Sequence, residues 1–247
     1  MTVYIITWCR DPAALYGSLL TFRTLRTGFP GADVVVIDNG TEGEPRKAIE
    51  KAARWVGADY AWRQEMPHWA ILETTLARSA GPCVFVDPDV VFWKLMRLPQ
   101  DCLWAGRLIP RFMDEYTGCV TQPRLHTSML WFPNAPRFCD EARKITAKYW
   151  EAPLFRPSMH NVDGQWIRFD TGASLYGALG GRAFSDELDR YDHIFCGSHL
   201  SHVSPRIDAE SRVAFESAHE IAKGDDLSPL RGLWKQQQQH FEQRKLL

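Results

Sequence analysis

Short apolar runs alternate with amphipathic stretches along residues 1–92 of the chain. Continuous apolar runs are typical of strands buried on both faces, and apolar residues at helical spacing are typical of helices that pack on a sheet. The pattern predicts strands at 3–8, 33–37, 59–63 and 83–86, and helices at 12–27, 44–56 and 67–80. Strands and helices that alternate with short connections predict a doubly wound α/β fold with a mostly parallel sheet.

The pattern is less regular after Trp93. It predicts strands at 103–109 and 125–132, a helix at 136–150, a loop at 150–165, a helix capped by residues 170–172 that ends near 179, a short strand and a Gly turn within 191–203, and a polar helix from 208. Neither an internal repeat nor a linker divides the chain. We therefore expect one α/β domain over 1–205 and a helical tail over 206–247 packed on the same domain.

Two carboxylates, Asp87 and Asp89, follow the apolar run 83–86. Residues two apart in an extended chain project from the same side, and Pro88 ends the strand at this point. Open α/β sheets bind ligands at the carboxyl ends of their strands. Adjacent carboxylates repel each other unless a cation lies between them, and oxygen ligands suit Mg²⁺ or Mn²⁺. Asp87 and Asp89 are therefore candidate metal ligands; the alternative is a turn cap and a solvated loop residue.

Polar residues also follow the first two predicted strands. Thr7 and Arg10 follow the first strand, and Asp38 and Asn39 follow the second. We expect these residues at the same sheet edge as the carboxylates; the alternative for Asp38 and Asn39 is a plain turn. His68 begins a predicted helix, where it is either a capping residue or part of an anion-binding helix N-terminus.

Composition narrows the class of protein. The chain has 247 residues, 45% of them hydrophobic, and a net charge of −1, which is ordinary for a globular domain and lacks the overall basic character of a nucleic-acid binder. Six cysteines without a Cys-x-x-Cys pair favour free thiols in a reducing compartment. Residues 1–6 lack the features of a signal peptide, and no apolar run reaches membrane-spanning length. We expect a cytoplasmic protein with no membrane span.

Four segments resemble, in order and spacing, those of the metal-dependent GT-A glycosyltransferases: 34–40, 68–72, the Asp-x-Asp strand 84–89, and the histidine-bearing stretch 191–203. The resemblance implies a GT-A fold. It also implies transfer of a sugar from a nucleoside-diphosphate sugar, such as a UDP-sugar, to an acceptor hydroxyl with Mn²⁺ or Mg²⁺. The implied site comprises donor contacts from Thr7, Arg10, Asp38, Asn39, His68 and Asp87, with Asp38 accepting hydrogen bonds from the nucleotide base. It also comprises the metal ligands Asp87, Asp89 and His193 and the catalytic base Asp170. The less regular C-terminal region would face the acceptor.

Some assignments have alternatives. His199 and His202 are alternatives to His193 as the third metal ligand, and Asp163 is an alternative to Asp170 as the base. Arg124 and His126 are expected on the acceptor side.

Two rival functions and the acceptor are also open. The rivals are a sugar nucleotidyltransferase, although the first strand lacks the Gly-rich loop usual for that class, and a catalytically inactive protein that binds nucleotide sugars or glycans. The acceptor is a glycan, a protein, a small molecule or a modified DNA base. Basic residues within 137–156 are either a local nucleic-acid surface or a solvated helix face.

Overall fold

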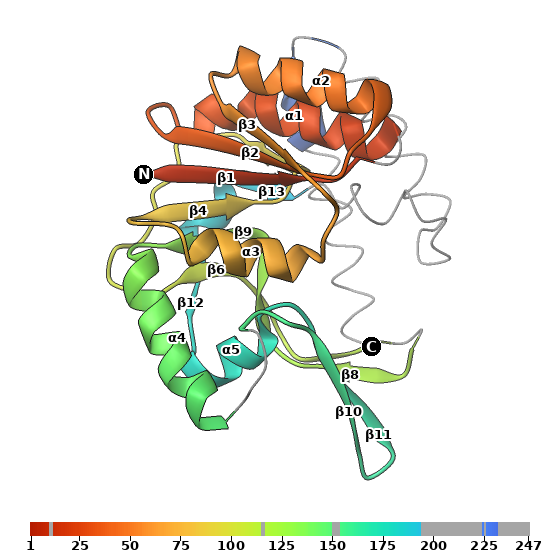
Figure 1. The fold of residues 1–247 in the computed structure, drawn as a ribbon, viewed down its shortest axis with the longest axis vertical. Helices are drawn as coiled ribbons and strands as arrows, with labels where there is room; N and C mark the ends of the chain where they lie inside the picture. Colours follow the sequence, from red (N-terminus) through yellow and green to blue (C-terminus); the bar gives the residue numbers. More distant parts are fainter. Residues whose placement is uncertain (10–11, 115–116, 150–153, 194–223, 225, 232–247) are drawn as a thin grey trace.

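The computed structural model describes residues 1–9, 12–114, 117–149, 154–193, 224 and 226–231. Its centre is a seven-stranded sheet in the order β12-β6-β9-β4-β1-β2-β3 (Figure 1). The strands are β1 (Thr2–Thr7), β2 (Asp33–Asn39), β3 (Asp59–Arg63), β4 (Cys83–Val86), β6 (Ala105–Ile109), β9 (Arg124–Phe132) and β12 (Arg182–Ala183). In this sheet β9 runs antiparallel to its neighbours β4 and β6, and the other described pairs are parallel. The predicted α/β fold with a mostly parallel sheet is confirmed.

Helices cover both faces of the sheet (Figure 1). One face carries α1 (Pro12–Gly28) and α2 (Gly43–Trp55), and the other carries α3 (His68–Leu76), α4 (Ala135–Tyr149) and α5 (Ala173–Leu179). Strand β4 contributes to both cores, because alternate strand residues face opposite sides. Val84 and Val86 belong to the first core, and Cys83 and Phe85 to the second. Burial on both faces explains the continuous apolar run in the sequence.

Two smaller sheets adjoin the central one. Strand β5 (Val90–Phe92) pairs antiparallel with β13 (Tyr191–His193), which follows the 3-10 helix η1 (Asp186–Asp189). A four-stranded sheet has the order β10-β11-β8-β7, with β7 (Phe112–Asp114), β8 (Cys119–Thr121), β10 (Ser158–Val162) and β11 (Gln165–Phe169). Residues 158–169, the β10–β11 hairpin, project from the body of the molecule (Figure 1) and are called the hairpin arm below.

The structure corrects the prediction of a loop at 150–165, because residues 158–162 form β10. Val162 pairs with Gln165 across a two-residue turn, in which Asp163 and Gly164 have φ angles of 50° and 85°. Positive φ at both positions defines a type I′ turn, and Asp-Gly is a typical sequence for it. This dipeptide was the local signal for a hairpin.

Helix α3 is also shorter than predicted, since it ends at Leu76 and not near residue 80. The Ser79 backbone N–H donates to the Leu76 carbonyl oxygen at 3.0 Å, which closes a turn ahead of Gly81.

The predicted tail at 206–247 and its boundary with 1–205 lie mostly outside the described residues. Within the described part, residues 228–231 are helical, Leu230 is buried, and the Arg231 guanidinium donates to the Asp189 carbonyl oxygen at 3.2 Å. None of the described helices is both long and apolar enough to span a bilayer. The cytoplasmic location stays a prediction.

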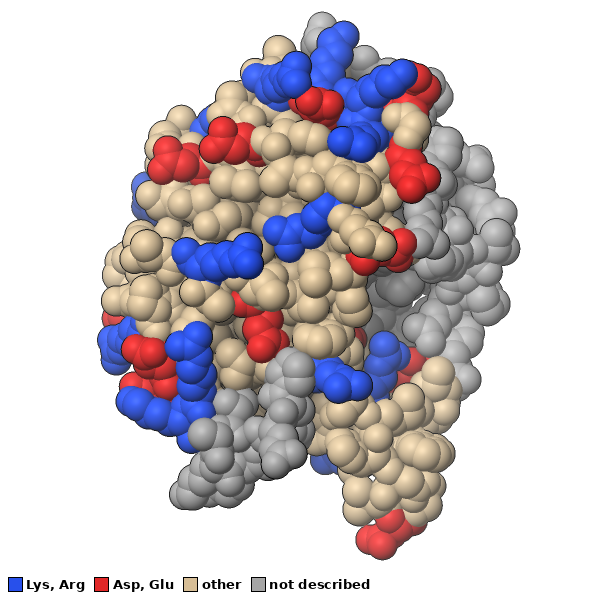
Figure 2. Space-filling model, viewed as in Figure 1, with Lys and Arg blue, Asp and Glu red and all other residues tan. Residues whose placement is uncertain are grey.

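Charged side chains of both signs are interspersed over the face shown in Figure 2. On α4, Lys144 Nζ lies 2.7 Å from Glu141 Oε1, and Arg143 Nη1 lies 3.7 Å from Asp140 Oδ1. Exposed pairs of this kind add little stability, but each acidic partner offsets one positive charge. Of the two interpretations of residues 137–156, the described part favours a solvated helix face.

Candidate active site

A pocket of about 480 Å³ lies at the edge where β1, β2 and β4 end. Parallel strands bring their carboxyl ends to one edge, and the antiparallel β9 brings its first residues to the same edge. The volume is in the usual range for a small-molecule site. The polar part of its lining consists of Asn39, Glu65, His68, Asp87, Asp89, Arg124, His126, Thr127, Asp170, Thr171 and His193. The pocket therefore brings together six of the predicted donor, metal and base residues, Asn39, His68, Asp87, Asp89, Asp170 and His193, and the two residues expected on the acceptor side, Arg124 and His126.

Asp87 directly follows β4, at the edge of the central sheet. Its backbone N–H donates to the Ser128 carbonyl oxygen of β9 at 3.0 Å. The Thr127 hydroxyl donates to Asp87 Oδ2 at 3.1 Å, and His68 Nε2 lies 3.5 Å from Oδ1. The carboxylate is thus oriented by two neighbouring elements and faces the pocket.

Asp89 and His193 come together because β13 pairs antiparallel with β5. In that register His193 lies opposite Val90, next to Asp89. His193 Nε2 is 3.0 Å from Asp89 Oδ1, and both side chains are buried. A strand of only three residues therefore brings a histidine from far along the chain to the Asp-x-Asp motif.

Helix α1 supports β5 from the side that β13 does not cover. The Val90 N–H donates to the Thr21 hydroxyl at 2.9 Å, and the Phe92 N–H donates to the Thr24 hydroxyl at 3.1 Å. At Gly17 a Cβ atom would lie 3.3 Å from Asp89 Cβ, so the absence of a side chain lets the helix approach the motif. Glycine is unfavourable inside a helix, and this close approach is the reason for it here.

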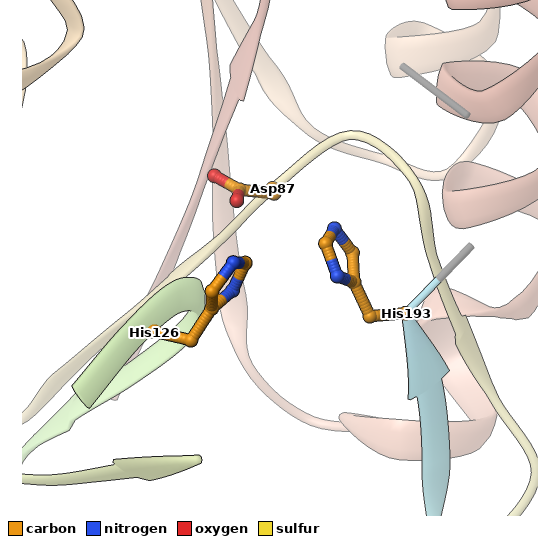
Figure 3. A group of neighbouring side chains, drawn as sticks. All are labelled: Asp87, His126 and His193. Carbon is orange, nitrogen blue, oxygen red and sulfur yellow. The ribbon is translucent and has the colours of Figure 1, made fainter. Parts of the chain in front are cut away.

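His126 joins the same group, whereas the sequence indicated it only for the acceptor side. Its ring centroid is 4.9 Å from that of His193, and the Ser128 N–H donates to His126 Nδ1 at 3.0 Å. Figure 3 shows Asp87, His126 and His193 around a common space. One oxygen or nitrogen from each of the three lies within 4.8 Å of those of the other two.

Burial and charge shift the pKa values of this group. Burial raises the pKa of Asp87, Asp89 raises it further, and His68, His193 and Thr127 oppose the rise. Burial by itself lowers the pKa of His193, but the Asp89 and Asp87 carboxylates outweigh it and raise that pKa overall. Both shifts indicate a buried cluster of negative charge that stabilises a bound positive charge.

Asp170 also lines the pocket, just after the hairpin arm. Its Oδ2 is 2.9 Å from Arg124 Nη2 and 3.9 Å from Arg168 Nη2, while Oδ1 accepts the Thr171 N–H at 2.8 Å. Burial lowers the pKa of Arg124, and Asp170 opposes that shift. Helix α5 begins at Ala173, with Gly172 as its N-cap, so Asp170 precedes the helix and its side chain does not cap it.

Asp38 is fully buried at the end of β2 and lies outside the pocket lining. Its Oδ1 accepts the Thr41 N–H at 3.0 Å, and its Oδ2 accepts the Tyr60 hydroxyl at 2.6 Å. These contacts give its carboxylate a structural task, and a base contact stays a prediction. Asn39 lines the pocket and exchanges two hydrogen bonds with the Met66 backbone, at 2.9 and 3.0 Å, which anchors the loop before α3.

Replacement of Tyr60 by phenylalanine is expected to lower the free energy of unfolding by about 1–3 kcal/mol, because Asp38 Oδ2 would lose its donor while remaining buried. Denaturant unfolding of the variant measures the change. Tyr176→Phe is the control, since Tyr176 is also a half-buried tyrosine and does not contact Asp38. Equal losses in the two variants would contradict the structural task of Asp38.

The remaining predicted residues lie elsewhere. Thr7 is buried at the end of β1, and its hydroxyl has no hydrogen-bond partner among the described residues. Asp163 lies in the turn of the hairpin arm and does not line the pocket. Arg10, His199 and His202 are outside the described residues.

No protein-family model and no curated protein matches the chain. Solved structures that it resembles include the glycosyltransferase GlyE of Streptococcus pneumoniae, with 11% identity, a TM-score of 0.44, and 75% of this chain and 46% of that chain covered. Another is the mannosyltransferase PcManGT of Pyrobaculum calidifontis in complex with GDP-Man and Mn²⁺, with 15% identity, a TM-score of 0.36, and 68% and 56% covered. A third is a nucleoside-diphosphate-sugar pyrophosphorylase of Vibrio cholerae, with 11% identity, a TM-score of 0.47, and 87% and 99% covered.

The chain thus spans about half the length of the two transferases. Glycosyltransferases are also the class that the sequence segments resemble. At these levels of similarity, the residues of the site, and not the matches, have to decide the function.

Proposed function

We propose that this protein is a metal-dependent glycosyltransferase, which moves a sugar from a nucleoside-diphosphate sugar to an acceptor hydroxyl, with UDP-sugars as the first donors to test. The observation that carries the proposal is the convergence of Asp87, Asp89 and His193 in a pocket that also holds the Arg124–Asp170 pair. The first group suits a cation and the diphosphate it neutralises. The pair offers a carboxylate for an acceptor hydroxyl.

The chemistry of Asp87, Asp89 and His193 fits a divalent metal ion. Protein oxygen and nitrogen ligands bind such ions at about 2.1 Å, so neighbouring ligand atoms lie about 3 Å apart. Asp89 Oδ1 and His193 Nε2 are 3.0 Å apart, and Asp87 offers an oxygen within 4.8 Å of a His193 nitrogen. One imidazole among oxygen ligands agrees better with Mn²⁺ than with Mg²⁺. A metal held here would supply charge neutralisation for the leaving diphosphate.

Different residues of the chain are proposed to contact the diphosphate and the nucleotide base of the donor. His68 is the first residue of α3, whose free N–H groups and positive end favour the diphosphate. Asn39 and the Met66 backbone are hydrogen-bonded to each other and line the same pocket, and they are proposed to lie beside the nucleotide base.

Asp170 is proposed as the base for an inverting transfer. As the acceptor oxygen bonds to the sugar carbon and the bond from that carbon to the diphosphate breaks, the Asp170 carboxylate accepts the hydroxyl proton. Arg124 positions this carboxylate through the 2.9 Å contact. The acceptor remains a glycan, a protein, a small molecule or a modified DNA base.

The test is a thermal-shift screen of UDP-, GDP-, ADP- and dTDP-sugars with and without Mn²⁺, followed by analysis of the released nucleotide. We expect one donor to raise the melting temperature only when Mn²⁺ is present, because the metal neutralises the diphosphate. The shift should be measurable, since a ligand at 100 times its Kd stabilises the folded protein by about 2.7 kcal/mol. Release of the nucleoside diphosphate is the expected product. Release of pyrophosphate would indicate a nucleotidyltransferase instead, and binding of donor without any release would indicate a binding protein.

A further inference from the structure

We infer that His126 donates a hydrogen bond from Nε2 to a phosphate oxygen of the donor's diphosphate and is not a ligand of the metal. The inference rests on the proposed function, because it assumes a diphosphate in the pocket. It gives a binding role to a residue that the sequence indicated only for the acceptor side.

Proximity alone would make His126 a metal ligand. Its ring lies 4.9 Å from that of His193, and one of its nitrogens lies within 4.8 Å of candidate ligand atoms from Asp87 and His193. Two imidazoles and a carboxylate would form a good transition-metal site. The protonation of the His126 ring decides between the two roles.

The backbone N–H of Ser128 determines which ring nitrogen of His126 carries the proton. Its N–H donates to His126 Nδ1 at 3.0 Å, and a backbone N–H is always a donor, so Nδ1 has to be the acceptor. A neutral imidazole that accepts at Nδ1 carries its proton on Nε2. Nε2 therefore has no lone pair for a metal. Ligation through Nδ1 instead would leave the N–H of the buried Ser128 without its acceptor.

The surroundings of His126 select an anion as its partner. Arg124 and His126 are two residues apart on β9, and both line the pocket. Arg124 Nη2 contacts Asp170, whereas its buried Nη1 has no hydrogen-bond partner among the described residues. This part of β9 thus places a guanidinium cation and an imidazole N–H among the residues that line the pocket. Phosphate oxygens accept such bonds without offering a proton, and a metal on Asp87 and His193 would hold a diphosphate beside them.

The experiment separates metal binding from diphosphate binding, using Mn²⁺ alone and then Mn²⁺ with inorganic pyrophosphate. Free Mn²⁺ is measured by electron paramagnetic resonance, and pyrophosphate binding by calorimetry at saturating Mn²⁺. We expect His126→Ala to bind Mn²⁺ within about 3-fold of the wild type and pyrophosphate roughly 10- to 100-fold more weakly, as for a hydrogen bond to a charged group. His126→Gln, which keeps an N–H donor, should restore most of the pyrophosphate affinity.

Two controls frame the result. His160→Ala changes an exposed histidine of the hairpin arm and should alter neither affinity, whereas His193→Ala should weaken Mn²⁺ binding by roughly 10-fold or more. Long-range ¹H–¹⁵N spectra of histidine-labelled protein should show His126 protonated at Nε2 and unprotonated at Nδ1.

The inference is overturned if His126→Ala weakens Mn²⁺ binding 10-fold, if pyrophosphate binds this variant as tightly as it binds the wild type, or if the wild type does not bind pyrophosphate. Failure of the proposed function looks different: pyrophosphate affinity would depend on His126, but no nucleotide sugar would be turned over.

Discussion

Replacement of Asp87 by alanine is expected to lower kcat for sugar transfer by roughly 10³-fold or more while the protein stays folded. Asp87 is the residue of the Asp-x-Asp motif whose carboxylate contacts β9 and α3 and faces the pocket. Its loss would remove a metal ligand and with it the stabilisation of the leaving diphosphate. The fold should tolerate the change. Burial and the neighbouring Asp89 raise the pKa of Asp87, which means that its ionised form is held at a cost in the folded protein.

The measurement is product formation at saturating Mn²⁺, alongside circular dichroism and thermal unfolding of the same preparations. Asp59→Ala is the matched control, since Asp59 is exposed at the first residue of β3, at the opposite edge of the sheet. Turnover within 10-fold of the wild type in Asp87→Ala would remove this residue from the metal site.

Replacement of Trp104 by alanine is expected to lower the free energy of unfolding by about 3–5 kcal/mol, the usual cost of removing a large aromatic side chain from a core. Trp104 is fully buried, and its ring lies 5.4 Å from that of Phe138 and 6.4 Å from that of Phe155. Its indole N–H donates to the Gly180 carbonyl oxygen at 2.6 Å, at the end of α5. The substitution therefore leaves both a cavity and an unpaired acceptor.

Chemical denaturation of Trp104→Ala and of Trp55→Ala provides the comparison. Trp55 is 73% exposed, so its loss should change stability by no more than about 0.5 kcal/mol. A similar loss in both variants would contradict the packing role of Trp104. Because the backbone around Gly172 packs against Phe155 and Trp104, the alanine variant should also loosen the segment that carries Asp170.

The part of the fold before residue 93 was largely predictable because β1, β2 and β4 are mostly buried on both faces. Such strands are continuous apolar runs, and each ends in polar residues at the sheet edge that holds the pocket. The position of His193 was predictable only as one of three candidates. Its register depends on the three-residue pairing of β13 with β5, for which the chain has little local signal.

His126 was expected only on the acceptor side, and its place beside Asp87 and His193 could not be found from local pattern. It lies near the start of a long strand, and strand starts are at the wrong edge of a parallel sheet. Only because β9 is antiparallel do its first residues reach the pocket. The Tyr60–Asp38 contact was hidden for a similar reason, since Tyr60 pairs with Val36 in the β2–β3 register and only its long side chain reaches Asp38. The hairpin arm, by contrast, was signalled by Asp163-Gly164.

The hairpin arm also shapes how the protein can evolve. Its two strands pair with each other and, through β11, with β8, so their side chains lie outside the two cores of the central sheet. Met159, Val162 and Trp166 are about half exposed, and exchanges at such positions usually cost little stability. Residues 158–166 should therefore tolerate substitutions at a smaller cost in stability than the buried strand β4, which precedes Asp87.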